Sequence, residues 1–495
     1  MSTALPRTKV RGGVGESVER PDGVPKVKGE FQYGSDLRRE GMLFGATLRS
    51  PHPHARILSI DVAAAKKMSG VKSVITSAEL PTRDLFGLMK LDQPVLATGR
   101  VRYVGEPVAI VAAETAEEAR LATRAIAVRY ELLAPITDPV ASLQPDAASL
   151  HQKGNVIEDV LVEHGDPDAT AEVVVAGEYE LGMQDQAALG PEAGLAIPRQ
   201  DGGVELHIAT QWLHEDLRQI APCLGLPESK VHLVLAGVGG AFGAREDVTL
   251  QIHTCLLALA TRRPVRMTYG REESFYGHVH RHPAKLWYMH GAKKNGDLVF
   301  VRATVVLDGG AYASSSPAVV ANAACFGAGP YRVPNARIHA VGAYTNNPPT
   351  GAMRGFGAVQ SCFAYEAQMD KLAAALGIDP VVLRERNALR NGDRIITSQP
   401  VEGSAPVADI VRRCADIAMP DGDIPSDPIS LPGGLGNLTR GEGVRRGVGF
   451  AAGLRTSATR TASTTSPRRA CASRAIPAGR SCTSTRPPPK SGRGS

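Results

Sequence analysis

The sequence predicts an α+β protein with at least two domains. Its 495 residues are too many for one ordinary domain. Short strand-like runs alternate with amphipathic helical runs along most of the chain, and a 43% share of hydrophobic residues is enough for sizeable cores. Two glycine-rich segments, 239–246 and 351–360, each end a strand-like run and open a helix-like run. In that layout, backbone N–H groups can meet an anionic ligand at a helix N-terminus.

The first predicted domain covers residues 29–138. Its run 107–113, Pro-Val-Ala-Ile-Val-Ala-Ala, predicts a buried strand. Thr115 and Glu118 then form a capping box, which predicts the start of a helix. Residues 126–132 predict a further strand, so this domain is expected to be an α/β unit.

Residues 139–162 are predicted to be a linker, and a larger domain is predicted over residues 163–454. Apolar residues with helical spacing predict helices over about 213–224 and 365–376, each ended by a glycine. The stretch 248–260 is apolar nearly all round, which predicts a buried helix.

The two ends of the chain differ from the domains. Residues 1–28 are predicted to be an irregular lead-in. Residues 455–495 consist mainly of Arg, Ser, Thr, Pro, Ala and Gly, so they cannot bury enough apolar surface to offset chain entropy and are predicted to be disordered. Their composition is also that of a frameshifted reading of a GC-rich gene.

The positive charge of the chain comes from its C-terminal end. The residues after Glu442 include Arg and Lys but no Asp or Glu. Without them the formal net charge changes from +6 to about −5. This balance does not predict binding to nucleic acid.

The cysteines and the apolar runs narrow the class of protein. The seven cysteines are scattered and include no C-x-x-C pair, which argues against a disulfide framework, a zinc site or an iron–sulfur cluster within this chain. Residues 1–13 lack the apolar core of a signal peptide, and the longest apolar runs are too short to span a membrane. We therefore expect a cytoplasmic protein that is not bound to a membrane.

The first glycine-rich segment, 239–246, has the sequence Gly-Gly-Ala-Phe-Gly-Ala-Arg-Glu. Its glycines allow a ligand to approach the backbone closely. Glu246 follows at a predicted helix start, where its charge suits the positive end of the helix. The segment matches neither the dinucleotide fingerprint nor the Walker A motif. By itself, a tight strand-to-helix turn explains it at least as well as a binding site.

The second segment, 351–360, has the sequence Gly-Ala-Met-Arg-Gly-Phe-Gly-Ala-Val-Gln and follows a rigid Asn-Asn-Pro-Pro-Thr turn. Arg354 can clamp an anion through two hydrogen bonds, and glycines flank Phe356. A glycine-rich turn around a core Phe would explain this segment alone. Two such segments separated by strand-rich sequence are harder to explain in that way.

Taken in order, these motifs resemble the large molybdenum-cofactor subunit of the xanthine dehydrogenase and aldehyde oxidase family. In that family a Gln precedes a conspicuous Glu, and Gly-Gly-x-Phe-Gly-x-Lys/Arg-Glu and x-Arg-Gly-Phe-Gly-x-x-Gln follow. Here Gln186 lies six residues before Glu192, and the two glycine-rich segments supply the rest. The runs 103–109 and 308–312 are also similar to the family. The resemblance covers about residues 10–450 and is nearest to bacterial xanthine dehydrogenases with separate subunits.

The resemblance implies an architecture and a cofactor. Residues 29–138 would form an α/β hammerhead domain, and residues 163–454 would form the first molybdopterin-binding lobe. The cofactor would be molybdenum on molybdopterin, in bacteria often in its cytosine dinucleotide form. The implied cofactor-binding residues are Gln186, Gly240, Phe242, Gly243, Arg354 and Gly355, with Gln186 bonded to an oxygen on molybdenum. The implied substrate-binding residues are Glu246, which would hydrogen-bond the substrate, and Phe356, which would pack against its ring.

The resemblance also implies a reaction and partners. The reaction would be hydroxylation of the purines hypoxanthine and xanthine, with water as the oxygen source. Electrons would leave through a 2Fe-2S cluster and FAD. Because this chain has neither cysteine clusters nor a dinucleotide fingerprint, these groups would lie on an iron–sulfur subunit and an FAD subunit of a hetero-oligomer.

The chain departs from the family in two respects. Asn322 aligns loosely with an Arg that grips the substrate in purine hydroxylases, so aldehydes or other N-heterocycles remain alternative substrates. The family's second cofactor lobe, with its base glutamate, has no counterpart here. We therefore expect a C-terminally truncated chain that has no catalytic residue of its own and is inactive alone. A non-catalytic remnant that only binds partner subunits, and a nucleotide-binding protein that uses its glycine loops, are the alternatives.

Two further groups of residues have the chemistry of candidate sites. His278, His280 and His282 alternate, so on a strand they would share one face and could bind a metal. No Cys or carboxylate in the sequence around them completes a ligand set, so exposed or hydrogen-bonded strand residues are expected, and no metal ligand is predicted. Ser314–Ser316 lie beside glycines but lack the Gly-x-Ser-x-Gly pattern of a hydrolase.

Overall fold

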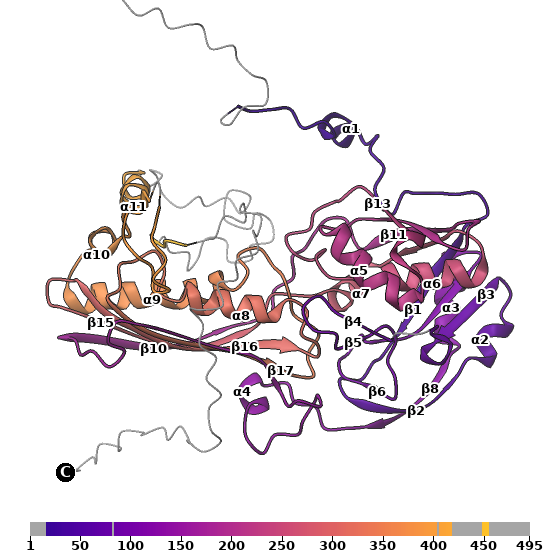
Figure 1. Ribbon diagram of the computed structural model, residues 1–495, viewed down its shortest axis with the longest axis horizontal. Helices are drawn as coiled ribbons and strands as arrows, with labels where there is room; N and C mark the ends of the chain where they lie inside the picture. The colour runs from indigo at the N-terminus through magenta and orange to yellow at the C-terminus, as the bar shows by residue number, and fades with distance from the viewer. Residues whose placement is uncertain (1–15, 82–83, 403–404, 418–447, 455–495) are drawn as a thin grey trace, which may run out of the picture.

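The structure is a computed structural model in which two large sheets are each packed against helices (Figure 1). It describes residues 16–81, 84–402, 405–417 and 448–454. The tail predicted over 455–495 lies outside the described residues, as does the first half of the predicted lead-in.

The first sheet has seven strands in the order β13-β12-β11-β14-β1-β7-β3. In that order the strands are Val231–Leu235, Val204–Ile208, Ala193–Pro198, Val265–Thr268, Leu43–Arg49, Pro107–Ala113 and Val71–Thr76. Helices α5 (Leu213–Leu224) and α6 (Gln251–Thr261) share one core with this sheet, and α3 (Ala116–Arg124) packs on β1 and β7.

The second sheet has five strands in the order β10-β15-β16-β17-β9. In that order they are Val173–Leu181, Ala284–Ala292, Leu298–Gly310, Asn335–Tyr344 and Val156–His164. Helices α8 (Ser316–Cys325) and α9 (Ala358–Leu376) cover one face of this sheet, and α10 (Pro380–Asn387) packs against α9 (Figure 1).

Smaller elements complete the described part of the chain. A three-stranded sheet contains β6 (Arg100–Val101), β2 (Ala55–Asp61) and β8 (Ala127–Leu132), and a two-stranded one contains β4 (Leu85–Phe86) and β5 (Gln93–Pro94). The remaining helices are α1 (Gly23–Lys28), α2 (Ala63–Lys67), α4 (Pro139–Ser142), α7 (Arg271–Gly277) and α11 (Val407–Ala415). Among the described residues, no helix combines the length and apolarity that crossing a membrane requires.

Local signals predicted several elements correctly. Strand β7 is buried along its whole length, and the Thr115–Glu118 capping box opens α3. Helices α5 and α9 end at Gly225 and Gly377, whose φ values of 67° and 64° are left-handed and therefore suit glycine. The predictions of the cap and of the two helix ends are confirmed because such signals act over three or four residues and need no tertiary partner.

Two segments that were predicted to lack regular structure contain some. The lead-in contains α1, and the linker 139–162 contains α4 and most of β9. The linker also does not separate two cores, because β1 pairs with β14 in the same sheet, with Leu43 opposite Val265. One face of β7 packs against α3, which precedes the linker, and the other shares a core with α6, which follows it. The two regions therefore pack together as one unit.

The helix predicted over 248–260 begins three residues later, at Gln251. The Gln251 side chain explains the shift, because its Oε1 accepts a hydrogen bond of 2.7 Å from the backbone N–H of Thr249. Glu246 therefore lies in a turn five residues before α6, and not at a helix start as predicted.

Asp216 on α5 makes stability depend on pH. Its side chain is fully buried, and burial raises its pKa from 3.8 to about 7, although hydrogen bonds from Thr210 and Gln251 oppose the shift. Because the folded pKa lies above the ordinary value, the stability contribution is complete below about pH 4 and is lost as the pH rises through 7. We expect Asp216→Asn to raise the melting temperature at pH 8 by at least about 3 °C, a gain that shrinks toward pH 4. Thermal melts between pH 4 and 8 check this.

The matched control is Glu215→Gln, on the same helix but with 41% of its side chain exposed. It should leave the melting temperature nearly unchanged at every pH. A gain from Asp216→Asn that is independent of pH would contradict the assignment of the effect to ionisation.

Candidate cofactor and substrate site

The two glycine-rich segments meet at one cavity of about 460 Å³. Six of the predicted site residues line it, namely Phe242, Gly243, Glu246, Arg354, Gly355 and Phe356. The other lining residues are Gln211, Trp212, Asn322, Phe326, Ala352, Met353 and Ala358. Segments that lie about a hundred residues apart in the sequence therefore share a single concave surface.

Phe242 and Phe356 share an uncommon backbone conformation. Their φ values are 53° and 45°, in the left-handed region that bulky residues avoid. Each is followed by a glycine with positive φ, Gly243 at 106° and Gly357 at 92°. Such strain persists only where the surrounding structure imposes it, and it concentrates at ligand sites. The repeated strain at one cavity therefore points to a binding function.

The two segments also touch through their backbones. The N–H of Arg354 donates a 2.8 Å hydrogen bond to the carbonyl oxygen of Phe242. The guanidinium of Arg281 donates to the carbonyl oxygen of Arg354 at 2.9 Å, while the Arg354 side chain is exposed. At Gly243 an added Cβ would lie 2.4 Å from the carbonyl oxygen of Ala352. Glycine is therefore needed at position 243 for the segments to approach this closely.

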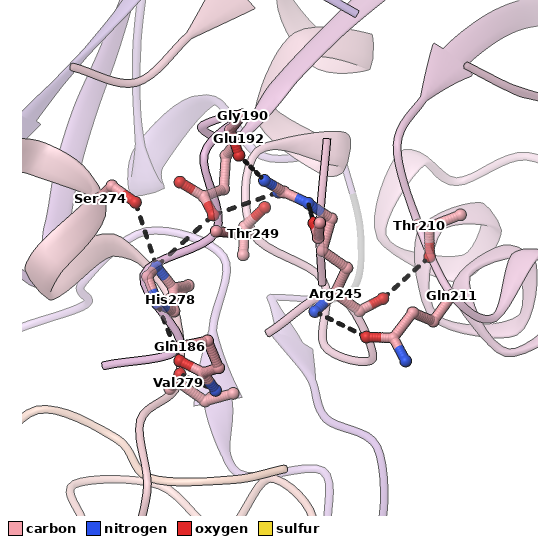
Figure 2. A network of polar contacts seen from close by, with 12 residues as sticks. Gln186, Gly190, Glu192, Thr210, Gln211, Arg245, Thr249, Ser274, His278 and Val279 are labelled. Atoms are coloured by element: carbon pink, nitrogen blue, oxygen red, sulfur yellow. Dashed lines mark hydrogen bonds and ion pairs between the residues drawn. The ribbon is translucent and has the colours of Figure 1, made fainter. Parts of the chain in front are cut away.

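A buried ion pair fixes the first segment from behind (Figure 2). The guanidinium of Arg245 lies 3.1 Å from the Glu192 carboxylate, and the side chains are 4% and 3% exposed. The same guanidinium donates to the carbonyl oxygens of Gly190 and Gly240. Arg245 thus joins Glu192, the residue before β11, to the glycine turn that lines the cavity.

Gln211 was not predicted as a site residue. Its side-chain Oε1 accepts a hydrogen bond from the backbone N–H of Gly243 at 3.1 Å. It accepts another from the backbone N–H of Arg245 at 3.4 Å (Figure 2). These two N–H groups are therefore occupied within the protein and do not face a ligand. Gln211 and Trp212 lie outside every motif, so only the fold could bring them to the cavity.

Glu246 is the ionisable acidic group of the cavity wall. Burial raises the pKa of its carboxyl from 4.5 to about 7, and the nearby Asp247 carboxylate raises it further. The side chain is therefore a mixture of protonated and ionised forms near neutral pH. It can donate a hydrogen bond in one form and accept one in the other.

Two of the predicted cofactor-binding residues do not line the cavity. The Gln186 side chain is buried, and its amide nitrogen donates to the carbonyl oxygens of Val279, at 3.1 Å, and Ala352, at 2.7 Å. Gly240 has a φ of 110° and accepts a hydrogen bond from Arg245. Both residues support the cavity wall from behind.

The sequence predicts that the histidines of the run 278–282 are exposed or hydrogen-bonded, and the structure shows the second case for His278, which contacts Ser274 and Gln186, and for His282, which contacts Ser316. His278, His280 and His282 are buried, with 6%, 3% and 0% of their surfaces exposed. The carboxylate that the sequence around them lacks is supplied by Asp185, ninety-three residues before His278, whose side chain lies against His278 and His280. The sequence could not indicate this carboxylate, because only the tertiary structure brings Asp185 to these rings.

The family comparisons agree with this arrangement. A family model described as "Molybdopterin cofactor-binding domain" matches residues 150–388, and one described as "Aldehyde oxidase and xanthine dehydrogenase, a/b hammerhead domain" matches residues 28–134. The aldehyde oxidoreductase structure from Desulfovibrio gigas superposes with a TM-score of 0.77 at 31% identity, over 80% of this chain and 45% of that one. Quinoline 2-oxidoreductase from Pseudomonas putida 86 gives a TM-score of 0.74 at 29% identity, over 81% and 53%.

Two curated relatives show how much of such proteins the chain spans. A probable xanthine dehydrogenase subunit of Bacillus subtilis is 39% identical, over 80% of this chain and 54% of the relative. The nicotinate dehydrogenase large molybdopterin subunit of Eubacterium barkeri is 36% identical, over 82% of this chain and 96% of the relative. The chain therefore spans about half the length of the first relative and nearly all of the second.

The fold and the family models thus define a molybdopterin-binding protein of an oxidoreductase family. The chain belongs to the xanthine dehydrogenase and aldehyde oxidoreductase family of molybdenum hydroxylases. The predicted order of a hammerhead domain followed by a molybdopterin-binding domain is confirmed.

The residues around the cavity fit a molybdopterin cofactor. Four lining residues have positive φ and bend the backbone around the cavity, namely Phe242, Gly243, Gly355 and Phe356. A Cβ at Gly243 would collide with the backbone of Ala352 on the opposite segment. The cavity wall combines aromatic side chains with the exposed cation of Arg354 and the carboxyl of Glu246. An anionic, ring-containing group suits these surroundings.

Proposed function

We propose that this cavity forms part of the active site of a molybdenum hydroxylase that oxidises an N-heterocyclic substrate, with hypoxanthine and xanthine as the first candidates. The observation that carries the proposal is that two strained Phe-glycine segments and the Glu246 carboxyl line one cavity. The relatives named for xanthine and for nicotinate support this substrate class. The relative named for aldehydes in Megalodesulfovibrio gigas, at 32% identity, supports the alternative of aldehyde oxidation.

In this proposal Phe242, Gly243, Arg354 and Gly355 bind the molybdopterin cofactor. When bound, the cofactor supplies two-electron oxidation with water as the oxygen source. Gln186 acts behind this surface, because its amide fixes the carbonyl oxygen of Ala352. Gly240 has a similar supporting role through its hydrogen bond from Arg245.

Glu246 and Phe356 would bind the substrate. The Glu246 carboxyl can donate to a ring nitrogen or an exocyclic oxygen below about pH 7, and can accept from a ring N–H above it. Phe356 would pack against the ring. Asn322 fixes this residue, because its Nδ2 donates a 3.1 Å hydrogen bond to the carbonyl oxygen of Phe356.

The complete enzyme in this proposal contains more than the described residues. The base glutamate would come from the region of the longer relatives that this chain does not match. A 2Fe-2S subunit and an FAD subunit would accept the electrons in a cytoplasmic hetero-oligomer, and the cofactor would carry the cytosine dinucleotide extension.

The test is a molybdenum analysis of the chain purified with its partner subunits from the native host. We expect about one molybdenum per chain and turnover of hypoxanthine, xanthine or nicotinate with a dye as electron acceptor. Absence of molybdenum would favour the non-catalytic remnant. Molybdenum together with turnover of aldehydes alone would replace the proposed substrate class.

Glu246→Gln tests the substrate contact. We expect kcat/KM for the heterocycle to fall by at least about 10-fold, because an amide has no ionised form and so loses the hydrogen bond that the carboxylate accepts from the substrate. The limb of the pH profile near 7 should also disappear, while the molybdenum content stays unchanged. Steady-state kinetics from pH 5 to 9 check this, with the exposed Glu215→Gln as the control. An unchanged pH profile would contradict the role of Glu246.

A further inference from the structure

Asp185, His278 and His280 converge behind the cavity. Nε2 of His278 lies 2.9 Å, and Nε2 of His280 lies 3.3 Å, from the same Asp185 oxygen, Oδ2. Only 14%, 3% and 4% of these three side chains are exposed. One ligand atom from each residue lies within 4.8 Å of the others, which is compact enough to surround one ion.

Gln186 directs a fourth atom to the same place. Its Oε1 lies 3.2 Å from Nε2 of His278. The amide nitrogen is occupied by the carbonyl oxygens of Val279 and Ala352, so the orientation of the side chain is fixed. The oxygen of Gln186 must therefore face the imidazole, as Figure 2 shows.

One carboxylate oxygen of this cluster, Oδ2 of Asp185, has no directed hydrogen bond within the protein. Oδ2 of Asp185 is buried and lies at ion-pair distance from Nε2 of both rings. Neither Nε2 is oriented so that it could donate a hydrogen bond to this oxygen. The two imidazoles are stacked, with centroids 4.8 Å apart and planes at 7°.

We propose that Asp185, His278 and His280 bind a divalent transition-metal cation of the Zn²⁺ type, with Oε1 of Gln186 as the fourth ligand. Tetrahedral zinc bonds nitrogen and oxygen ligands at about 2.0–2.2 Å, which sets those ligand atoms about 3.3 Å apart. Three of the distances between these ligand atoms, 2.9, 3.3 and 3.2 Å, agree with that spacing, and the ligand atoms of Asp185, His278 and His280 all lie within 4.8 Å of one another. Two imidazoles and one carboxylate are a ligand set that zinc prefers.

Neighbouring groups prepare the ligands for this role. Nδ1 of His278 lies 3.4 Å from the Ser274 hydroxyl and 3.5 Å from a Glu192 carboxylate oxygen, so its proton has acceptors and Nε2 is left for the ion. Oδ1 of Asp185 accepts a 2.6 Å hydrogen bond from the N–H of Ala187, which leaves Oδ2 to coordinate.

The ion would fasten the wall of the cofactor cavity. The carbonyl oxygen of His280 accepts a 2.8 Å hydrogen bond from the N–H of Gly351, and Gln186 binds the carbonyl oxygen of Ala352. The ion would thus join the Asp185 loop to the second glycine-rich segment. This inference goes beyond the proposed function and does not require that molybdopterin be bound.

The test uses Co²⁺ as a spectroscopic substitute for Zn²⁺ on the full chain after treatment with a chelator. We expect one Co²⁺ per chain, with the intense visible absorption of a four-coordinate site, and displacement by Zn²⁺. Asp185→Asn and His280→Gln should weaken binding by at least about 100-fold, more than the loss of an outer partner costs. The control is His232→Gln, which removes an imidazole from the more exposed Glu205–His207–His232 group and should change nothing.

Wild-type protein without the Co²⁺ absorption, or an affinity unchanged in both variants, would overturn the proposal. If the variants fail to fold, X-ray absorption of zinc bound to the wild-type chain decides the matter, because two imidazole ligands are expected and none or one would contradict the site. Molybdenum is measured on the same samples, so loss of the cofactor and loss of this ion are distinguished.

Discussion

Gly243→Ala is expected to abolish molybdenum binding and to destabilise the chain. The φ of Gly243 is 106°, and a Cβ there would lie 2.4 Å from the carbonyl oxygen and 2.6 Å from the carbonyl carbon of Ala352. Both are backbone atoms of the opposite glycine-rich segment, so no side chain can move aside. An alanine in this strained conformation alone lowers the free energy of unfolding by about 1–3 kcal/mol. If the segments move apart to make room, the hydrogen bond from the Arg354 N–H to the Phe242 carbonyl oxygen is lost as well.

Molybdenum content and the free energy of unfolding in denaturant measure the two effects. Gly202→Ala is the matched control, because Gly202 also has a positive φ, 81°, but a Cβ there would meet nothing within 4 Å. The control should lose about 1–3 kcal/mol of stability and retain its molybdenum. Equal molybdenum in the two variants would show that contact between the segments is not needed for the cofactor.

Arg245→Gln should lower the free energy of unfolding by about 3–5 kcal/mol, the usual cost of removing one partner from a buried ion pair. The change would leave the Glu192 carboxylate, which is 3% exposed, without its counter-charge. It would also remove the hydrogen bonds that Gly190 and Gly240 accept from the guanidinium. Because Gly240 belongs to the first glycine-rich segment, molybdenum content should fall as well.

Denaturant unfolding and molybdenum analysis check this expectation. The control is Arg218→Gln, which removes the exposed pair with Glu215 on α5 and should cost less than about 1 kcal/mol. Adding Glu192→Gln to Arg245→Gln should recover part of the loss, because the unpaired charge disappears. A loss from Arg245→Gln no larger than that of the control would contradict a structural role for the buried pair.

By itself, the sequence determined the features that depend on a few neighbouring residues. The capping box at Thr115 and the glycine stops at Gly225 and Gly377 follow from local chemistry, and the unbroken apolar run 107–113 indicated the strand β7. The Phe-centred glycine segments identified the family and six of the cavity-lining residues, because close contact between backbones requires glycine at defined spacings. Motifs of this kind keep their local geometry wherever the chain carries them.

Only the tertiary structure decided which distant groups meet. In the folded protein, strands from both sides of the predicted linker lie in one sheet. The Gln186 amide binds the carbonyl oxygen of Ala352 behind the cavity, and Asp185 lies against His278 and His280. It also moved the start of α6 to Gln251 through a side-chain hydrogen bond. The physical reason is that strand pairing, burial and the partners of buried polar groups depend on contacts between residues far apart in the chain, which the spacing of motifs does not encode.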